Sequence, residues 1–301
     1  MKLFSKKPNT TAVTAFIYEQ IRRKKSVRVN KCLVTHIERY EQSRGIKLLS
    51  NSFSDAVCED FICYLQSRKL LKSTIKGYVD AIFSVFRKIK RAGYEVDFSF
   101  ENVKSGKESS TTVYLTRTEI DNIYSMKIAN KRRRLVRDIF ITGCYTGLRF
   151  SDLSKLSDKN IVGNIIKKKT QKTGETVEIP IHSYVREIIK KHDGFPRYES
   201  SIFNFNKVLK TICRHSSIND KVLIERTRSG KVERFTKKKC DLVSSHTARR
   251  SFATNAYLAG IPTAKIMLMT GHKTEQSFFS YIRIGKTENA RELAKHPFFN
   301  S

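Results

Sequence analysis

The stretch ENVKSGKESSTTV has no apolar periodicity and is rich in Ser, Lys and Gly. A segment of this composition has no face to bury and is typical of a linker. Directly behind it, Thr116 and Glu119 lie at the spacing of a capping box, which marks the start of a new helix. The sequence therefore predicts two domains, residues 1–105 and residues 114–301, joined by a linker at 106–113. A chain of 301 residues is long enough to form both cores.

The first domain is predicted to be a four-helix unit. Apolar residues recur at helical spacing in STIKGYVDAIFSVFRKIKRAG, where Ser73 is the predicted N-cap and Gly93 the stop. The same pattern occurs in SDAVCEDFICYL behind Ser54, and in VNKCLVTHIERYEQSRG, which ends at Gly45. A shorter helix is expected over residues 11–24. This unit has a basic outer surface and no candidate for chemistry.

The second domain is predicted to be mostly helical, with one insert rich in β-branched residues. IVGNIIKKKTQKTGETVEIPI alternates on both sides of Thr173 and Gly174, which is typical of a β-hairpin. ERTRSGKVERFTKKK is expected to form a basic hairpin or loop. The expected helices cover about 182–192, 202–214, 246–259, 262–269 and 274–283. The predicted fold class is therefore mainly α with a small β-sheet, an α+β arrangement.

The charge of the chain indicates a polyanionic partner. It has 59 Lys and Arg against 28 Asp and Glu, a net charge of +31. The excess is +11 over residues 1–110 (22 basic, 11 acidic) and +20 over residues 111–301 (37 basic, 17 acidic), so we expect both domains to contact the partner. A membrane is the less suitable polyanion, because no apolar run approaches about 20 residues and the N-terminus lacks the pattern of a signal peptide.

The cysteines argue for a reducing compartment. The six are scattered without a CxxC pair, which makes a metal site or a disulfide framework improbable and favours buried thiols in the cytoplasm: Cys32, Cys58, Cys63, Cys144, Cys213 and Cys240. The spacing of Cys58 and Cys63 places them on different faces of a predicted helix. No GxxxxGK motif is present, so nucleotide hydrolysis has no support.

Four stretches of the second domain carry candidate chemistry. TGLRFSDLSKL contains Arg149, and KKKTQKTGE contains Lys172 at the hairpin tip. SSHTARRSFATNA contains His246 and Arg249, three residues apart on one helix face, and TGHKTEQSFFSY contains His272 and Tyr281. Each residue alone has an ordinary explanation: an arginine at a helix end binds carbonyls, a lysine at a hairpin tip is solvated, and a tyrosine beside two phenylalanines packs in a core.

Taken together, these six residues suit the cleavage of a phosphodiester. The forked guanidinium groups of two arginines match the oxygens of a phosphate on which charge develops. A tyrosine hydroxyl serves as a covalent nucleophile if its proton is drawn off, while a lysine protonates the leaving alkoxide and a histidine moves protons. The set contains no carboxylate of the kind that holds Mg²⁺, so the sequence predicts chemistry without a metal or other cofactor.

These motifs resemble those of the tyrosine recombinases, the phage integrase family. TGLRFSDL, HTARRSFAT and GHKTEQSFFSY are most similar to integrases of Bacteroides-type mobile elements. The resemblance covers nearly the whole chain and implies a helical SAM-like core-binding domain followed by a mixed α/β catalytic domain. It also implies the residue roles: Arg149 and Arg249 bind the scissile phosphate, Lys172 is the general acid, His246 and His272 assist, Tyr281 attacks, and Asp152 supports the site.

The function implied is that of a site-specific DNA recombinase or integrase. Such an enzyme cuts and rejoins double-stranded DNA through a 3′-phosphotyrosyl intermediate without metal or ATP, acts as a homotetramer on DNA, and is expected in the cytoplasm at the nucleoid. Many members of the family carry an N-terminal arm-binding domain, whereas here the core-binding helices begin almost at Met1, so we expect either a simple recombinase without arm sites or a shortened member. A tail is expected at 284–301. A type IB topoisomerase and a DNA-binding protein that has lost catalysis remain as alternatives, and Lys167, Lys168 or Lys169 could replace Lys172.

Overall fold

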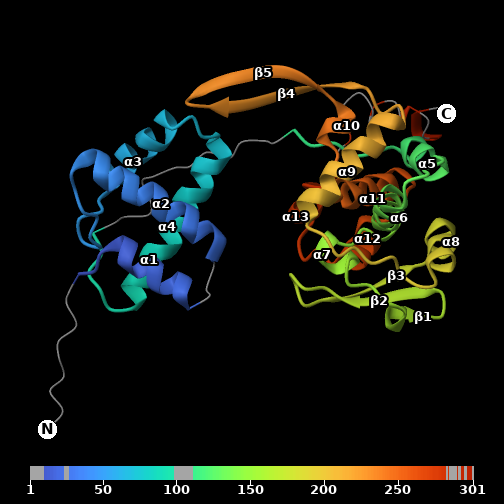
Figure 1. Ribbon diagram of the computed structural model, residues 1–301, viewed down its shortest axis with the longest axis horizontal. Helices are drawn as coiled ribbons and strands as arrows, with labels where there is room; N and C mark the ends of the chain where they lie inside the picture. Colours follow the sequence, from blue (N-terminus) through green and yellow to red (C-terminus); the bar gives the residue numbers. More distant parts are fainter. Residues whose placement is uncertain are drawn as a thin grey trace, which may run out of the picture. The chain divides into compact units, whose positions relative to one another are not determined.

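The computed structural model describes residues 10–23, 27–97, 111–282, 284, 290, 293, 294 and 297–299. Two compact units are present (Figure 1). The first comprises Met1–Ser110 together with Ile224–Phe235, and the second comprises Thr111–Leu223 together with Thr236–Ser301. Most of the predicted linker, from residue 106 to residue 110, lies outside the described residues. In the described part of the chain no helix is long and apolar enough to cross a membrane.

Four helices form the core of the first unit: α1 (Val13–Arg22), α2 (Val27–Arg44), α3 (Asp55–Ser67) and α4 (Lys72–Arg91). Their apolar faces meet in one cluster, to which α4 contributes a buried stripe at helical spacing: Ile75, Val79, Ile82, Phe86 and Ile89. Ser54 caps α3 as predicted, its hydroxyl accepting the N–H of Val57. The predicted cap at Ser73 is wrong, because the carbonyl of Leu71 already accepts the N–H of Ile75, so Leu71 is the N-cap and α4 starts two residues earlier than predicted.

The second unit is mainly helical, with small antiparallel sheets. Its helices are α5 (Arg117–Ser125), α6 (Lys131–Thr146), α7 (Phe150–Leu153), α8 (Ser183–His192), α9 (Ile202–His215), α10 (Lys239–Leu242), α11 (Ser245–Leu258), α12 (Thr263–Thr270) and α13 (Glu275–Phe279), with 3-10 turns η1 (Asp158–Asn160) and η2 (Pro297–Phe299). The predicted capping box is confirmed: the hydroxyl of Thr116 accepts the N–H of Glu119, and the Glu119 carboxylate accepts the N–H of Thr116.

The predicted hairpin at Thr173 and Gly174 is confirmed as part of a three-stranded sheet. The strands are β1 (Ile161–Val162), β2 (Ile165–Lys169) and β3 (Thr176–Pro180), in the order β1-β2-β3. All pairs are antiparallel, and Lys167 faces Glu178. The basic segment forms a second hairpin, β4 (Lys221–Arg228) and β5 (Lys231–Lys238). Its outer part, from Ile224 to Phe235, groups with the first unit, where Arg228 pairs with Leu71.

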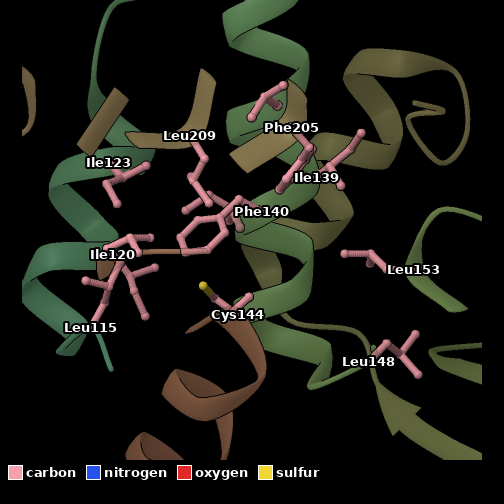
Figure 2. Packing of buried hydrophobic residues seen from close by; sticks show 14 of the residues in the cluster. Leu115, Ile120, Ile123, Ile139, Phe140, Cys144, Leu148, Leu153, Phe205 and Leu209 are labelled. Carbon is pink, nitrogen blue, oxygen red and sulfur yellow. The ribbon is translucent and has the colours of Figure 1, made fainter. Parts of the chain in front are cut away.

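The helix α6 lies in the centre of the second unit. Every residue from Val136 to Cys144 is buried, so this part of the helix is enclosed on all sides, and its polar residues Arg137, Asp138 and Thr142 are buried together with its apolar ones. Figure 2 shows its side chains between those of α5 on one side and Leu148 and Leu153 on the other. Gly143 permits a close approach of α11, since a Cβ added there would lie 3.0 Å from the Cβ of Ala248.

A buried carboxylate joins α6 to α8. Asp138 has no exposed surface and accepts hydrogen bonds from Arg137 (2.8 Å), Lys191 (2.9 Å) and His192 (2.8 Å). Burial alone raises the pKa of this carboxyl, but the hydrogen bonds from His192, Lys191 and Arg137 outweigh it and lower the pKa overall. The charge is therefore paired and belongs to the packing of the unit.

Two expectations from the sequence need correction. The last predicted helix, 274–283, ends at Phe279, so Tyr281 follows the helix and is not part of it. The cysteines are not all buried: Cys32 and Cys63 are exposed, whereas Cys58, Cys144, Cys213 and Cys240 are buried. Cys58 and Cys63 do lie on different faces, as their spacing predicted.

Replacing Gly147 by Ala should destabilise the second unit more than the same change at Gly163. Both glycines have a positive φ, 65° and 59°, but an added Cβ at Gly147 would lie 2.4 Å from Cδ1 of Phe252, whereas Gly163 has open space. We expect losses of about 2–4 kcal/mol for Gly147→Ala and about 1 kcal/mol for Gly163→Ala in urea unfolding. Equal losses would show that the contact with Phe252 costs nothing.

Candidate active site

The guanidinium group of Arg249 is buried at the point where two helices end. Arg249 lies on α11 and is 1% exposed. Its Nη1 donates to the carbonyl of Gly147 at 2.8 Å, and its Nη2 donates to the carbonyl of Thr270 at 2.7 Å. Gly147 is the C-cap of α6 and Thr270 is the last residue of α12. The negative ends of two helix dipoles therefore hold a buried cation.

Both helices end in the same way, at a Thr-Gly pair. Gly147 and Gly271 have φ values of 65°, in the left-handed region that glycine adopts without strain. The hydroxyls of Thr146 and Thr270 each donate to the carbonyl one turn earlier, at 2.8 and 2.7 Å. These turns leave backbone carbonyls of the last turn free to accept from Arg249.

Three buried polar atoms beside this anchor have no hydrogen-bond partner: Nε of Arg249, Nη1 of Arg149 and Oδ2 of Asp152. A buried guanidinium N–H without an acceptor is costly, so two of them in one place indicate that a ligand supplies the acceptor. Burial and the charge of Arg149 lower the pKa of Arg249 to about 10, which leaves it protonated at neutral pH. An anion with several oxygens fits these two donors.

Asp152 links the short helix that follows Arg149 to the hairpin that carries Lys172. Arg149 follows the end of α6 and is the N-cap of α7. Asp152 lies in α7 and is fully buried, and its Oδ1 accepts the N–H of Gln171 at 2.8 Å. Because Gln171 precedes Lys172, this hydrogen bond fixes the turn of the β2–β3 hairpin against α7.

His272 is a neutral acceptor for Arg249. The Thr270 hydroxyl lies 2.8 Å from Nδ1 of His272 and itself donates to a carbonyl of α12, so Nδ1 carries the proton. Nε2 then accepts from Nη2 of Arg249 at 2.9 Å. Burial and the charges of Arg249 and Arg149 lower the pKa of His272 to about 3, in agreement with this tautomer.

Tyr281 lies at the edge of a small core with its hydroxyl directed into the site. Ala253, Ala256, Ile266 and Phe278 form this core beneath the Tyr281 ring, joining α11, α12 and α13. The ring lies 5.3 Å from the guanidinium carbon of Arg249 and 4.8 Å, centroid to centroid, from His272. The ring of this residue therefore packs in a small core, while its hydroxyl faces polar groups.

His246 is the partner of that hydroxyl. Its Nε2 lies 3.1 Å from the Oη of Tyr281. Desolvation and the positive charges of Arg250, Arg249, Arg149 and Lys172 lower the pKa of His246 to about 4, although part of its ring is exposed. The imidazole is thus neutral at physiological pH and has a lone pair that can accept the tyrosine proton.

Lys172 is exposed at the tip of the β2–β3 hairpin, and its positive charge acts electrostatically on the site. It is one of the cations that lower the pKa of His246. Two of the alternative lysines are engaged elsewhere: Lys167 pairs with Glu178 at 2.8 Å, and Lys168 donates to the carbonyl of Lys155 at 2.8 Å. These contacts favour Lys172 over both of them.

The structure brings all six predicted residues to one region. Arg249, His272, Tyr281 and His246 are linked by direct contacts, whereas Arg149 and Lys172 are linked to them by charge. The two carbonyls that hold Arg249 and the contact of Thr270 with His272 were not predicted from the sequence. The repeated TG in CYTGLRF and MTGHKT is the signal that could have found them.

The arginines supply positive charge, the Tyr281 hydroxyl is a possible nucleophile, and His246 is a possible proton acceptor. None of the contacts described above joins a carboxylate to either arginine by a hydrogen bond. Groups of this kind can bind an anion such as a phosphate. Among the described residues, no group of three or more His, Cys, Asp or Glu side chains could hold a metal ion.

The low pKa of His272 predicts how stability depends on pH. Below about pH 6.5 a histidine of the unfolded chain takes up a proton, whereas His272 in the folded state stays neutral until about pH 3. As the pH falls from about 6.5 to about 3, the free energy of unfolding therefore decreases by at most about 1.4 kcal/mol per pH unit because of His272. Above about pH 6.5 both states hold a neutral His272, so the residue contributes no pH dependence. His272→Gln should flatten the decline between pH 6 and 4 in urea unfolding, whereas His215→Gln on the exposed end of α9 should not. An unchanged slope in His272→Gln would contradict the assignment.

Comparison with known proteins agrees with this geometry. The model of the phage integrase family matches residues 114–288. A search of curated proteins gave no match. Solved structures share the fold: the Tn1549 transposon integrase in complex with circular intermediate DNA has a TM-score of 0.62 at 17% identity, over 95% of this chain and 100% of that chain.

Two further solved structures are similar over both units. The lambda integrase dimer bound to a COC′ core site has a TM-score of 0.64 at 16% identity, over 91% of this chain and 96% of that chain. The XerH site-specific recombinase bound to palindromic difH substrate has a TM-score of 0.59 at 15% identity, over 80% of this chain and 70% of that chain. At these identities the likeness establishes the fold, and the family match spans more than half of the sequence. The chain therefore belongs to the phage integrase family.

Proposed function

We propose that this protein is a site-specific DNA recombinase that cuts and rejoins DNA through a covalent 3′-phosphotyrosyl intermediate. One observation carries the proposal: the Oη of Tyr281 lies 3.1 Å from a neutral His246, beside two arginines with buried, unpartnered N–H groups. The family and the DNA-bound integrases that share the fold support DNA as the partner. The net charge of +31 favours the same partner.

The scissile phosphate binds between the two arginines. Nε of Arg249 and Nη1 of Arg149 donate to its non-bridging oxygens and so gain the acceptors that they lack in the free protein. Arg249 is already fixed by two helix ends, so little reorganisation is needed when charge develops on the phosphate. The phosphate also offsets the positive charges that depress the pKa of His246.

Cleavage forms one bond and breaks one. The Oη of Tyr281 attacks phosphorus while its proton passes to Nε2 of His246, and the bond from phosphorus to the 5′ oxygen breaks. Lys172 donates a proton to that oxygen, which leaves as a free 5′-hydroxyl. The phosphodiester is replaced by a phosphotyrosyl ester, so the bond energy is kept and the scheme requires neither ATP nor a metal. A 5′-hydroxyl from a partner strand then reverses the steps.

His272 acts through Arg249 in this scheme. Its Nε2 accepts from the guanidinium and its Nδ1–H is held by Thr270, so it orients the phosphate-binding group. The similarity of the three motifs to integrases of Bacteroides-type mobile elements extends the proposal to DNA integration by such an element.

We further propose that the protein acts as a tetramer on DNA, linked by the tail at 284–301. Of the tail, residues 284, 290, 293, 294 and 297–299 are described, and the side chains of Phe298 and Phe299 are 77% and 60% exposed. Two large aromatic groups in water favour docking on a second copy. A largely apolar pocket of about 660 Å³ in the second unit is a suitable acceptor; its lining includes Tyr145, Ile181, Phe252, Leu258 and Met269.

Two other functions fit some of these observations. A type IB topoisomerase has similar chemistry but relaxes DNA as a monomer, and the exposed aromatic tail argues against it. A DNA-binding protein without catalysis has no need of a hydroxyl 3.1 Å from a neutral imidazole. Tests of covalent capture and of assembly separate these alternatives.

Tyr281→Phe should bind DNA with nearly unchanged affinity and form no covalent complex, because only the nucleophilic oxygen is lost. The assay exposes the protein to a pool of nicked random-sequence duplexes and recovers adducts that resist SDS. Tyr257→Phe, on the partly exposed end of α11, is the matched control and should capture DNA like the wild type. An adduct formed by Tyr281→Phe would remove Tyr281 from the mechanism.

Deleting residues 286–301 should leave binding of one protomer to DNA nearly normal while strand exchange falls by at least about tenfold, since the link between protomers is lost. The double variant Phe298→Ala, Phe299→Ala keeps the chain length and should show the same loss. Gel-shift experiments measure binding and assembly, and recombination between two captured sites measures exchange. If the shortened protein still assembles and recombines at the full rate, the tail does not link protomers; relaxation of supercoiled DNA by monomers would favour the topoisomerase.

A further inference from the structure

The turn that carries Lys172 is a compact structure with its own internal bonds. The N–H of Thr170 donates to the carbonyl of Glu175 at 2.8 Å, and the N–H of Gly174 donates to the carbonyl of Thr170 at 3.0 Å. The hydroxyls of Thr170 and Thr173 lie 2.7 Å apart. The turn therefore moves as one piece, and the position of Lys172 depends on what holds that piece.

One side of the turn is held through the buried Asp152, as described above. The other side packs on the Gly271 turn, immediately before His272. A Cβ added at Gly271 would lie 3.2 Å from Cγ1 of Val177 and 3.8 Å from Oγ1 of Thr173, so the absence of a side chain at Gly271 permits this close approach. The general-acid turn and the turn that carries His272 are thus direct neighbours.

An ion pair closes the contact between the two turns. Nζ of Lys273 lies 2.8 Å from Oε1 of Glu175, with both side chains about half exposed. The hydrogen bond and charge of Lys273 lower the pKa of the Glu175 carboxyl, so the pair is charged at neutral pH. Glu175 ends the Lys172 turn, and Lys273 directly follows His272, so the pair joins the backbones of the two turns.

We infer that the ion pair between Glu175 and Lys273 is a latch that positions Lys172 for its proton transfer. The inference rests on the proposed function and adds two positioning residues to it. Neither residue contacts the reacting atoms; they act by holding the Lys172 turn against the turn that leads to Tyr281. Lys172 is exposed on a flexible stem, so small movements of the turn change how often its ammonium group reaches the leaving oxygen.

The test compares two leaving groups. The substrate is the nicked duplex that the wild-type protein captures from the random pool, made either with the normal 5′ oxygen at the scissile phosphate or with sulfur in its place. A thiol has a pKa of about 8.5, so a thiolate leaves without a general acid. A defect in positioning Lys172 therefore slows cleavage of the oxygen substrate and spares the sulfur substrate, whereas a general structural defect slows both.

The variants are Glu175→Lys, Lys273→Glu and the double exchange of both. Glu178→Lys is the matched control, because it breaks the pair with Lys167, which has the same length of 2.8 Å and similar exposure but lies away from the tip. Cleavage rates are measured at saturating DNA concentration, so that changes in DNA affinity caused by the altered charge do not affect the measured rates.

Each single variant should cleave the oxygen substrate about five-fold more slowly, the ceiling set by the strength of an exposed ion pair. On the sulfur substrate the loss should be less than about two-fold, and the double exchange and Glu178→Lys should both be near the wild type on either substrate. Equal losses on both substrates, no loss, or a loss that the exchange does not restore would overturn the latch. Failure of the wild type to capture any duplex would instead contradict the proposed function, independently of the latch.

Discussion

The hydrogen bonds from the buried guanidinium of Arg249 to the carbonyls of Gly147 and Thr270 are the interaction on which this site depends. A cation with 1% exposure needs compensation, and here the ends of two helices provide it in place of a carboxylate. The bonds also tie α6 and α12 to α11, which carries Arg249. Any change that moves one helix end therefore moves the cation, and the packing of the unit and the geometry of the site are maintained by the same contacts.

The choice of carbonyls as partners has a chemical consequence. A carboxylate bonded to Arg249 would compete with a phosphate, whereas carbonyls hold the group in place and leave its full charge for a ligand. The buried carboxylate of Asp152 uses one oxygen to hold the backbone of Gln171. Burial, together with the positive charges of Arg249 and Arg149, also lowers the pKa values of His246 and His272, which keeps both rings neutral and able to accept hydrogen bonds.

The site is assembled from separate short segments. The end of α6 brings Arg149, the β2–β3 turn brings Lys172, α11 brings His246 and Arg249, and the segment from Thr270 to Tyr281 brings the rest. Arg149 lies between α6 and α7, and Lys172 lies in the turn between β2 and β3, so the positions of both side chains depend on the contacts that hold these connections. Contacts between the segments are therefore as important for the proposed chemistry as the side chains that perform it.

The sequence alone determined the helical pattern, the hairpin at Thr173 and Gly174 and the identity of the six candidate residues, because periodicity, caps and motif chemistry are local properties. It did not determine that α13 ends at Phe279, before Tyr281, because the apolar spacing of this stretch continues past the observed helix end. Only the tertiary structure decided the partners: which carbonyls bind Arg249, which nitrogen of His272 accepts, and that Lys167 and Lys168 of the hairpin are engaged elsewhere. The bond from Arg249 to Gly147 joins residues 102 positions apart, and no local pattern encodes the distance between them.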